Sequence, residues 1–250
     1  MTAPRKKRLD VLVVERGLAK SRETARTLIM SGNILVNDQP MDKPGMQLAE
    51  DARIISRKPD MPYVSRGGLK LAHALTEIGL DVNGLICLDV GASTGGFTDC
   101  LLQSGAARVY AVDVGYGQLD WKLRQDGRVT VIERTNIRYI TRAVLPEDFD
   151  LVTIDVSFIS LKIVIPAIEP FLKPDGHILA LVKPQFEVGR DQVGKGGVVR
   201  DARLHDQVIT ELERYFEKLS LVSETVIPSP VLGPKGNREF LMYLARDPAK

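Results

Sequence analysis

Leu85-Ile-Cys-Leu-Asp-Val-Gly-Ala-Ser-Thr-Gly-Gly-Phe-Thr-Asp-Cys-Leu-Leu102 is the stretch that decides the fold of this 250-residue chain. It begins as an apolar run with one aspartate near its end, which is typical of a buried parallel strand. Gly91, Gly95 and Gly96 then favour a turn. The apolar residues that follow recur at helical spacing, so the order is strand, glycine turn and helix. That order predicts the first unit of a doubly wound α/β sheet.

The glycine turn also predicts a ligand site. Glycines allow the backbone to approach a ligand closely, and the N-terminus of the next helix offers unpaired N–H groups. The spacing is Gly-x-x-x-Gly-Gly, which differs from the Gly-x-Gly-x-x-Gly of dinucleotide enzymes. The next apolar segment, residues 108–113, ends in Asp113, where an acid of a nucleotide-binding sheet accepts hydrogen bonds from both ribose hydroxyls. The turn and this acid together predict a nucleotide-type cofactor.

The overall composition is that of a soluble globular protein, with 44% apolar and 26% charged residues. No stretch reaches about 18 apolar residues and no signal-peptide core is present, so we expect a cytoplasmic protein that does not cross a membrane. Cys87 and Cys100 lie in apolar contexts and are expected to be reduced core thiols. The histidines are scattered, so no metal site is predicted.

Charge is unevenly distributed along the chain, although the net charge is only +2. Residues 1–60 carry 12 Lys or Arg against 8 Asp or Glu, whereas the remainder carries 22 against 24. A basic segment on a near-neutral body indicates a polyanion-binding appendage. We therefore predict a small basic domain at 1–58, a proline-stiffened linker at 59–64 and a larger α/β domain at 65–250.

The small domain is predicted to be α+β, with helices over 8–17 and 22–31 and strands over 34–40 and 53–56. The motifs Arg-Leu-Asp, Gly-Leu-Ala-x-Ser-Arg-x-x-Ala, Gly-x-Ile-x-Val-Asn and Lys-Pro-Gly occur within it in this order. This pattern resembles the RNA-binding domain named after ribosomal protein S4. A charged helix face alone is ordinary in a soluble protein, but the resemblance implies contacts with RNA phosphates. The residues it implicates are Arg8, Lys20, Ser21, Arg22 and Arg26.

Polar side chains follow several predicted strands of the larger domain. Asn136 lies in the loop after the third strand, Asp155 ends the fourth and Lys183 ends the fifth. Ligands of open α/β sheets bind outside the carboxyl ends of the strands, so these side chains are expected to gather with Asp113 above the glycine turn. A lysine that ends an apolar strand must surface or be paired, which favours a charged pair with Asp155. Residues 189–201 are glycine-rich and basic, and are predicted to be an irregular functional segment. Further helices are predicted at 66–78 and 205–219, and further strands at 221–228 and 239–245.

Four short motifs of the larger domain resemble the FtsJ-like family of RNA ribose 2'-O-methyltransferases. They are Ser-Arg-Gly-Gly-Leu-Lys, Thr-Ile-Asp-Val-Ser-Phe, Leu-Val-Lys-Pro-Gln-Phe-Glu and Gly-Asn-Arg-Glu-Phe. The resemblance places a catalytic Lys-Asp-Lys-Glu tetrad at Lys70, Asp155, Lys183 and Glu239. The glycine turn departs from the family form, because Ser93-Thr94 precedes the glycines in place of a residue and proline.

With the RNA-binding domain included, essentially the whole chain is similar to the TlyA family, which is described as cytidine 2'-O-methyltransferases of ribosomal RNA and is often labelled haemolysin. This implies a Rossmann-like methyltransferase sheet, mostly parallel with an antiparallel last strand. It also implies S-adenosylmethionine as cofactor and ribosomal RNA in ribosomal subunits as partner, while no feature specifies an oligomeric state. The predicted cofactor-binding residues are Gly91, Ser93, Gly95, Gly96, Asp113, Asn136 and Asp155.

The chemistry of such a reaction fits the tetrad. A ribose 2'-hydroxyl is a weak nucleophile at neutral pH, and a well-placed base would accelerate its attack by about 10²–10⁴-fold. We assign Lys183 as that base, which must be neutral to act. A second lysine and the sulfonium of the cofactor would lower its pKa, whereas the nearby acids would oppose that shift. Asp155 and Glu239 are expected to orient the amines, with Lys70 as a second cation. Two alternatives are a membrane-active haemolysin and a non-catalytic RNA-binding protein.

Overall fold

The computed structural model of the chain describes residues 6–57 and 61–247. Its contacts divide the chain into two compact units, Met1–Met61 and Pro62–Lys250, which are named the N-terminal and C-terminal units. Residues 58–60, which include the start of the predicted linker, lie outside the described residues. Each unit has its own buried apolar core.

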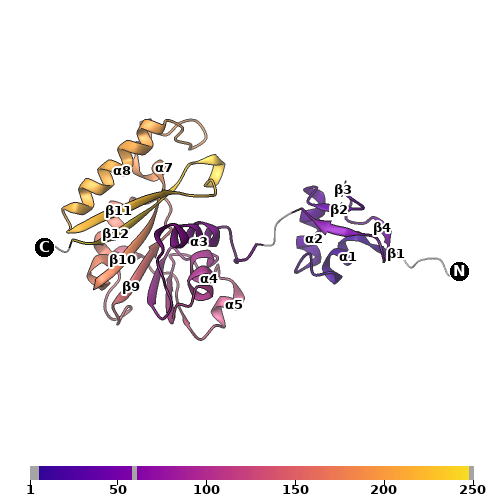
Figure 1. The fold of residues 1–250 in the computed structure, drawn as a ribbon, viewed down its shortest axis with the longest axis horizontal. Coiled ribbons are helices and arrows are strands. Elements are labelled where there is room, and N and C mark those ends of the chain that lie inside the picture. The colour runs from indigo at the N-terminus through magenta and orange to yellow at the C-terminus, as the bar shows by residue number, and fades with distance from the viewer. Residues whose placement is uncertain (1–5, 58–60, 248–250) are drawn as a thin grey trace. The chain divides into compact units, whose positions relative to one another are not determined.

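Within residues 6–57, the N-terminal unit combines two helices with two small antiparallel sheets. Its elements are β1 (Lys6–Arg8), α1 (Leu9–Glu15), α2 (Arg22–Met30), β2 (Ile34–Val36), β3 (Gln39–Met41), β4 (Gln47–Ala49) and β5 (Ile54–Ser56). Strand β2 pairs with β3 and β5, and β1 pairs with β4 (Figure 1). Leu9, Val13, Ile29 and Ile34 are fully buried in the core between them. This arrangement confirms the predicted α+β class.

Local chemistry sets the ends of both helices in this unit. Gly17 has a left-handed φ of +72°, which favours glycine directly after α1. The Ser21 hydroxyl accepts a hydrogen bond from the Thr24 N–H at 3.2 Å, so Ser21 caps α2. Strands β1 and β4 were not predicted, because three residues are too short to show an alternating pattern.

The C-terminal unit is built on one seven-stranded sheet (Figure 1). Its strands are β6 (Ile86–Val90), β7 (Arg108–Val112), β8 (Val129–Ile132), β9 (Phe149–Ile154), β10 (Leu172–Val182), β11 (Leu221–Pro228) and β12 (Phe240–Arg246). Its α-helices are α3 (Gly67–Ile78), α4 (Gly96–Gln103), α5 (Trp121–Arg124), α6 (Leu161–Ile168), α7 (Pro184–Glu187) and α8 (Ala202–Glu217). The strand order is β11-β12-β10-β9-β6-β7-β8.

Strands β10, β9, β6, β7 and β8 are parallel, whereas β12 is antiparallel to its neighbours β10 and β11. This confirms the predicted Rossmann-like sheet, which is mostly parallel with an antiparallel last strand. The chain winds outward from β6 to β8 and then returns to β9 on the other side of β6. Strand order therefore reverses between β6 and β9, and the crevice outside their carboxyl ends is where ligands of such sheets bind.

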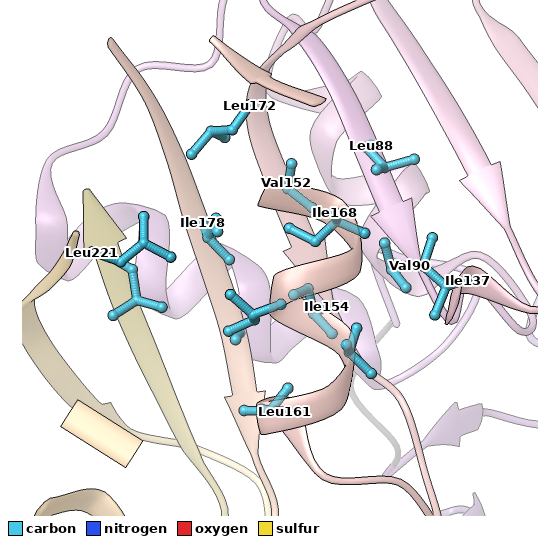
Figure 2. Packing of buried hydrophobic residues seen from close by; sticks show 14 of the residues in the cluster. Leu88, Val90, Ile137, Val152, Ile154, Leu161, Ile168, Leu172, Ile178 and Leu221 are labelled. Carbon is cyan, nitrogen blue, oxygen red and sulfur yellow. The ribbon is translucent and has the colours of Figure 1, made fainter. Parts of the chain in front are cut away.

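Helices cover both faces of the sheet. Apolar residues of α3 and α4 pack with one set of strand side chains, and those of α6 and α8 pack with the other set. Figure 2 shows α6, with Leu161 and Ile168, lying against Val152 and Ile154 of β9. Successive residues of β9 thus enter opposite cores, which explains why this strand reads as a continuous apolar run.

The structure differs from the sequence prediction at several element ends. Helix α8 begins at Ala202 because Asp201 caps it by accepting the Arg203 N–H at 2.9 Å. Helix α3 begins at Gly67, and Ser65 accepts the Gly67 N–H at 3.3 Å. The predicted irregular segment 189–201 contains a short bridge between Gly194 and Val198. Strand β10 starts at Leu172, and its pairing with β9 is irregular between Leu172 and His177, where a proline and a glycine occur.

Candidate active site

Two adjoining cavities lie at the carboxyl edge of the sheet, beside the reversal point. The larger has a volume of about 740 Å³ and the smaller about 270 Å³. Gly91, Ser93, Asp155 and Ser157 line both, so the cavities meet at these residues. A volume of this size accommodates a nucleotide-sized ligand.

The three glycines of the turn are required by close packing. Gly91 has a φ of +83°, and a Cβ there would lie 2.6 Å from the carbonyl oxygen of Asp155. Gly95 has a φ of +96°, and a Cβ would lie 2.3 Å from Leu123 Cδ1. Gly91 lines both cavities and Gly96 lines the smaller one, whereas Gly95 lines neither and packs beneath the turn. Gly91 thus lets the turn touch the end of β9, where Asp155 begins the next loop.

Asp113 and Asn136 line the larger cavity. The Asp113 carboxylate accepts the N–H of Ser93 at 2.7 Å and the N–H of Gly115 at 2.6 Å, one on each oxygen. Each carboxylate oxygen keeps a lone pair, so the group is oriented and still able to accept two hydroxyl donors. The side-chain oxygen of Asn136 accepts the Arg138 N–H at 3.1 Å, which leaves its amide N–H groups available.

All four tetrad residues line the smaller cavity. Lys183 follows β10 and its Nζ lies 2.6 Å from Asp155 Oδ1 and 3.0 Å from Ser157 Oγ. Lys70 on α3 donates to Glu239 Oε2 at 2.5 Å, across a sequence separation of 169 residues. The structure therefore brings the sequence-predicted tetrad together as two lysine–carboxylate pairs.

Burial explains why the lysines need these partners. Lys70 and Lys183 have exposed fractions of only 5% and 8%, and Glu239 of 2%. A charge this far from water must be paired and hydrogen-bonded to be tolerated. Lys70 also lies in the first turn of α3, where a cation is electrostatically unfavourable. The negative charge of the Glu239 carboxylate offsets the positive potential at this end of the helix.

Glu239 has one oxygen in use and one free. Its Oε2 accepts from Lys70, whereas its buried Oε1 has no hydrogen-bond partner among the described residues. Gly233 makes room for this oxygen, because a Cβ at Gly233 would lie 1.9 Å from Oε1. Glu239 thus holds Lys70 through one oxygen, while its other oxygen packs against Gly233.

Asp89, the acid inside β6, supports the glycine turn from below. It is fully buried and accepts hydrogen bonds from the Thr98 hydroxyl of α4 at 2.6 Å and the Thr153 hydroxyl of β9 at 3.1 Å. Burial raises the pKa of Asp89 to about 7, and the two hydroxyls partly oppose that shift. Asp89 therefore ties together the three elements that surround the turn.

Two further contributors were missed by sequence reasoning. Ser157 accepts a hydrogen bond from Lys183, and the Phe158 ring contacts the Phe186 ring at an interplanar angle of 49°, with centroids 4.9 Å apart. Phe158 is 90% exposed with a left-handed φ of +64°, an uncommon conformation for a bulky residue, and it lines the larger cavity with Phe186. The sequence could have indicated Ser157 and Phe158 through their position just after Asp155, at the carboxyl end of an inner strand.

The predicted RNA-binding residues of the N-terminal unit divide into two groups. Arg8 and Arg22 both form ion pairs with the buried Asp10, at 3.0 Å each. Lys20 and Arg26 are exposed, and no ion pair involves either of them in the described part of the unit. Ser21 is exposed and serves as the cap of α2.

Two kinds of feature were not found. No group of three or more His, Cys, Asp or Glu that could hold a metal ion occurs among residues 6–57 and 61–247. Of the helices in these residues, none is both long enough and apolar enough to cross a membrane. Cys87 and Cys100 are buried free thiols in the same range.

Comparison with known proteins identifies relatives that match almost the whole chain. A Bacillus subtilis protein named "Putative rRNA methyltransferase YqxC" is 49% identical over 245 residues, covering 96% of this chain and 86% of that protein. The Mycobacterium tuberculosis "16S/23S rRNA (cytidine-2'-O)-methyltransferase TlyA" is 45% identical over 241 residues, covering 96% and 90%. A solved structure titled "Putative hemolysin from Streptococcus thermophilus" matches with a TM-score of 0.77 and 42% identity, over 99% of this chain and 90% of that one.

The family matches follow the two units. The S4 domain matches residues 7–54, and the FtsJ-like methyltransferase family matches residues 63–246. The second match covers most of the chain, and it contains both cavities and all four tetrad residues. The chain therefore belongs to the FtsJ-like methyltransferase family, as a TlyA-type member that carries an S4 domain before the methyltransferase domain.

Proposed function

We propose that this protein transfers a methyl group from S-adenosylmethionine to the ribose 2'-hydroxyl of a cytidine in ribosomal RNA. The observation that carries the proposal is the pair of lysine–carboxylate contacts in a cavity that opens into a nucleotide-sized one at Asp155. The two curated relatives are named as ribosomal RNA methyltransferases, and these names support the choice of substrate.

The residues of the larger cavity fit S-adenosylmethionine. Asp113 presents an oriented carboxylate for ribose hydroxyls, and Asn136 presents an amide for the adenine edge. Gly91 and Ser93 bring backbone to the junction, where the methionine part of the cofactor would pass toward Asp155. When bound there, S-adenosylmethionine supplies an electrophilic methyl group.

The smaller cavity supplies the proton chemistry. A neutral Lys183 would take the proton of the ribose hydroxyl as that oxygen attacks, so that the O–H bond breaks while an N–H bond forms on Lys183. Asp155 and Ser157 hold the Lys183 amine from two sides, which fixes where that proton goes. Lys70 would stabilise the developing negative charge on the oxygen, and Glu239 holds Lys70 in place.

The N-terminal unit would hold the RNA. Arg8, Lys20, Ser21, Arg22 and Arg26 are offered as contacts to the phosphate backbone, which position a nucleic acid without reading its sequence. Ribosomal subunits are the proposed form of the substrate, and the cytoplasm is the proposed place of the reaction.

Methyl transfer to separated ribosomal subunits tests the proposal. Small and large subunits from cells that lack this enzyme are incubated with the protein and methyl-labelled S-adenosylmethionine, and the RNA is digested to nucleosides. We expect label in 2'-O-methylcytidine, and none with Lys183→Ala. Label in a base-methylated nucleoside would change the proposed acceptor, and no transfer to either subunit would favour a non-catalytic RNA-binding protein.

The hemolysin title of the Streptococcus thermophilus relative names a different class of activity. No contact described above requires a membrane, whereas the tetrad and both cavities are explained by methyl transfer. Release of haemoglobin from erythrocytes by the purified protein, at a level that Lys183→Ala retains, would support that second activity.

A further inference from the structure

Among residues 6–57, Asp10 is the charged side chain that is most deeply buried. Its exposed fraction is 0%, yet its partners Arg8 and Arg22 keep side-chain exposures of 41% and 59%. Arg8 donates Nε–H and Nη2–H to its two oxygens at 3.0 Å each, and Arg22 Nη2–H donates to Oδ2, also at 3.0 Å. One buried carboxylate therefore holds two surface guanidinium groups from different elements.

The backbone around this contact is built to hold it. The Asp10 N–H donates to the carbonyl of Pro44 at 3.0 Å, which ties α1 to the Lys-Pro-Gly turn. A Cβ at Gly45 would lie 3.3 Å from Arg8 Nη1, so the guanidinium lies directly on the backbone of this turn. Arg22 is the first residue of α2, whose position is fixed by the Ser21 cap.

The charge balance of the cluster is positive. The hydrogen bonds from Arg8, with those from Arg22, lower the pKa of Asp10 to about 2, so the carboxylate is ionised at neutral pH. Two guanidinium groups against one carboxylate leave a surplus of one positive charge. Most of the N–H donors of both arginines remain without a protein partner among the described contacts, because Asp10 engages only one edge of each.

We propose that Asp10 is a positioning residue that holds Arg8 and Arg22 side by side, so that the two guanidinium groups together grip one phosphodiester of the RNA backbone. The inference rests on the proposed RNA-binding role of this unit. A guanidinium fork matches phosphate geometry, and holding the side chain in advance removes the entropy cost of ordering it on binding. Lys20 and Arg26, which have no such carboxylate partner among residues 6–57, would add positive charge without this fixed orientation.

Replacing Asp10 by Asn separates positioning from simple charge. If Asp10 were only a negative charge near the RNA, its removal would tighten binding. If it positions the arginines, Asp10→Asn should weaken binding by about tenfold, because the charge-assisted contacts that fix the forks are lost. The matched control is Asp38→Asn, which removes an exposed carboxylate paired with Arg53 at 3.1 Å and should leave binding unchanged or tighter.

The measurement is the fluorescence anisotropy of a labelled RNA hairpin titrated with the full-length protein over a range of salt concentrations. Arg8→Ala, Arg22→Ala and the double variant are measured in parallel. If both arginines grip one phosphate, the double variant should lose little more affinity than either single variant. The slope of log affinity against log salt concentration should then fall by the amount expected for about one phosphate contact, not two. Additive losses, with a fall of about two phosphates, would overturn the shared grip.

Folding is monitored by circular dichroism and thermal unfolding of each variant. Should Asp10→Asn unfold the N-terminal unit, Arg22→Lys replaces it, because lysine keeps the charge but lacks the fork and should lose most of the same affinity. If the wild-type protein binds RNA and the Asp10→Asn or Arg22→Lys variant binds it with the same affinity, this inference is contradicted but the RNA-binding role is not. No binding by the wild-type protein contradicts the RNA-binding role itself.

Discussion

Replacing Asp89 by Asn should change how the stability of the protein depends on pH. Asp89 is fully buried beneath the glycine turn, with its oxygens accepting from the hydroxyls of Thr98 and Thr153. Burial raises its pKa to about 7 in the folded protein. An aspartate in the unfolded chain has a pKa of about 4, so the two states bind this proton with different strength.

The sign and size of the effect follow from that difference. Because the pKa of Asp89 is higher in the folded state, its contribution to stability is most favourable below about pH 4 and is lost as the pH rises toward about 7. Each pH unit within that window costs about 1.4 kcal/mol. Between pH 5 and pH 8 the free energy of unfolding should therefore fall by about 3 kcal/mol through this one group.

Urea unfolding at pH 5, 6, 7 and 8 measures this contribution. The Asn variant carries no titrating group at this position, so its stability relative to wild type should improve by about 3 kcal/mol over the range. Asp126→Asn is the control, because Arg128 lowers the pKa of Asp126 and its curve should parallel the wild type above pH 5. Parallel curves for wild type and Asp89→Asn would refute the reasoning, since the buried carboxylate would then titrate alike in both states.

Three further substitutions test the active site. Lys183→Arg keeps the charge but cannot serve as a base, so single-turnover transfer should fall by about 10²–10⁴-fold at saturating cofactor, and a rate near wild type would remove Lys183 from that role. Asp113→Ala should weaken calorimetric S-adenosylmethionine binding by about 1–3 kcal/mol, and unchanged affinity would exclude Asp113 from the site. Gly233→Ala places a Cβ 1.9 Å from Glu239 Oε1 and should separate Glu239 from Lys70, lowering the rate but not cofactor affinity. A crystal structure of this variant with the ion pair intact would contradict that account.

Much of the scaffold was predictable because its signals are local. The Ser21 cap, the strand–turn–helix around Gly91 and the acid at Asp113 each depend on residues close together in the chain. Short or polar elements were not predictable in this way. Strands β1 and β4 form because they pair with each other, and three residues of sequence do not reveal such a partner.

The sequence by itself predicted the fold class and the edge of the sheet at which the cavities lie, whereas the four tetrad residues were predicted from the resemblance of their motifs to the FtsJ-like family. The pair of Lys183 with Asp155 was predicted from the ends of their strands, and the structure contains it. Only the tertiary structure decided that Lys70 pairs with Glu239 and that Ser157 also accepts from Lys183. Periodicity and turn chemistry report on burial and local conformation, whereas pairing depends on strand order. Because β12 inserts antiparallel beside β10, the residue that precedes it reaches the same cavity as a helix 169 residues earlier in the chain.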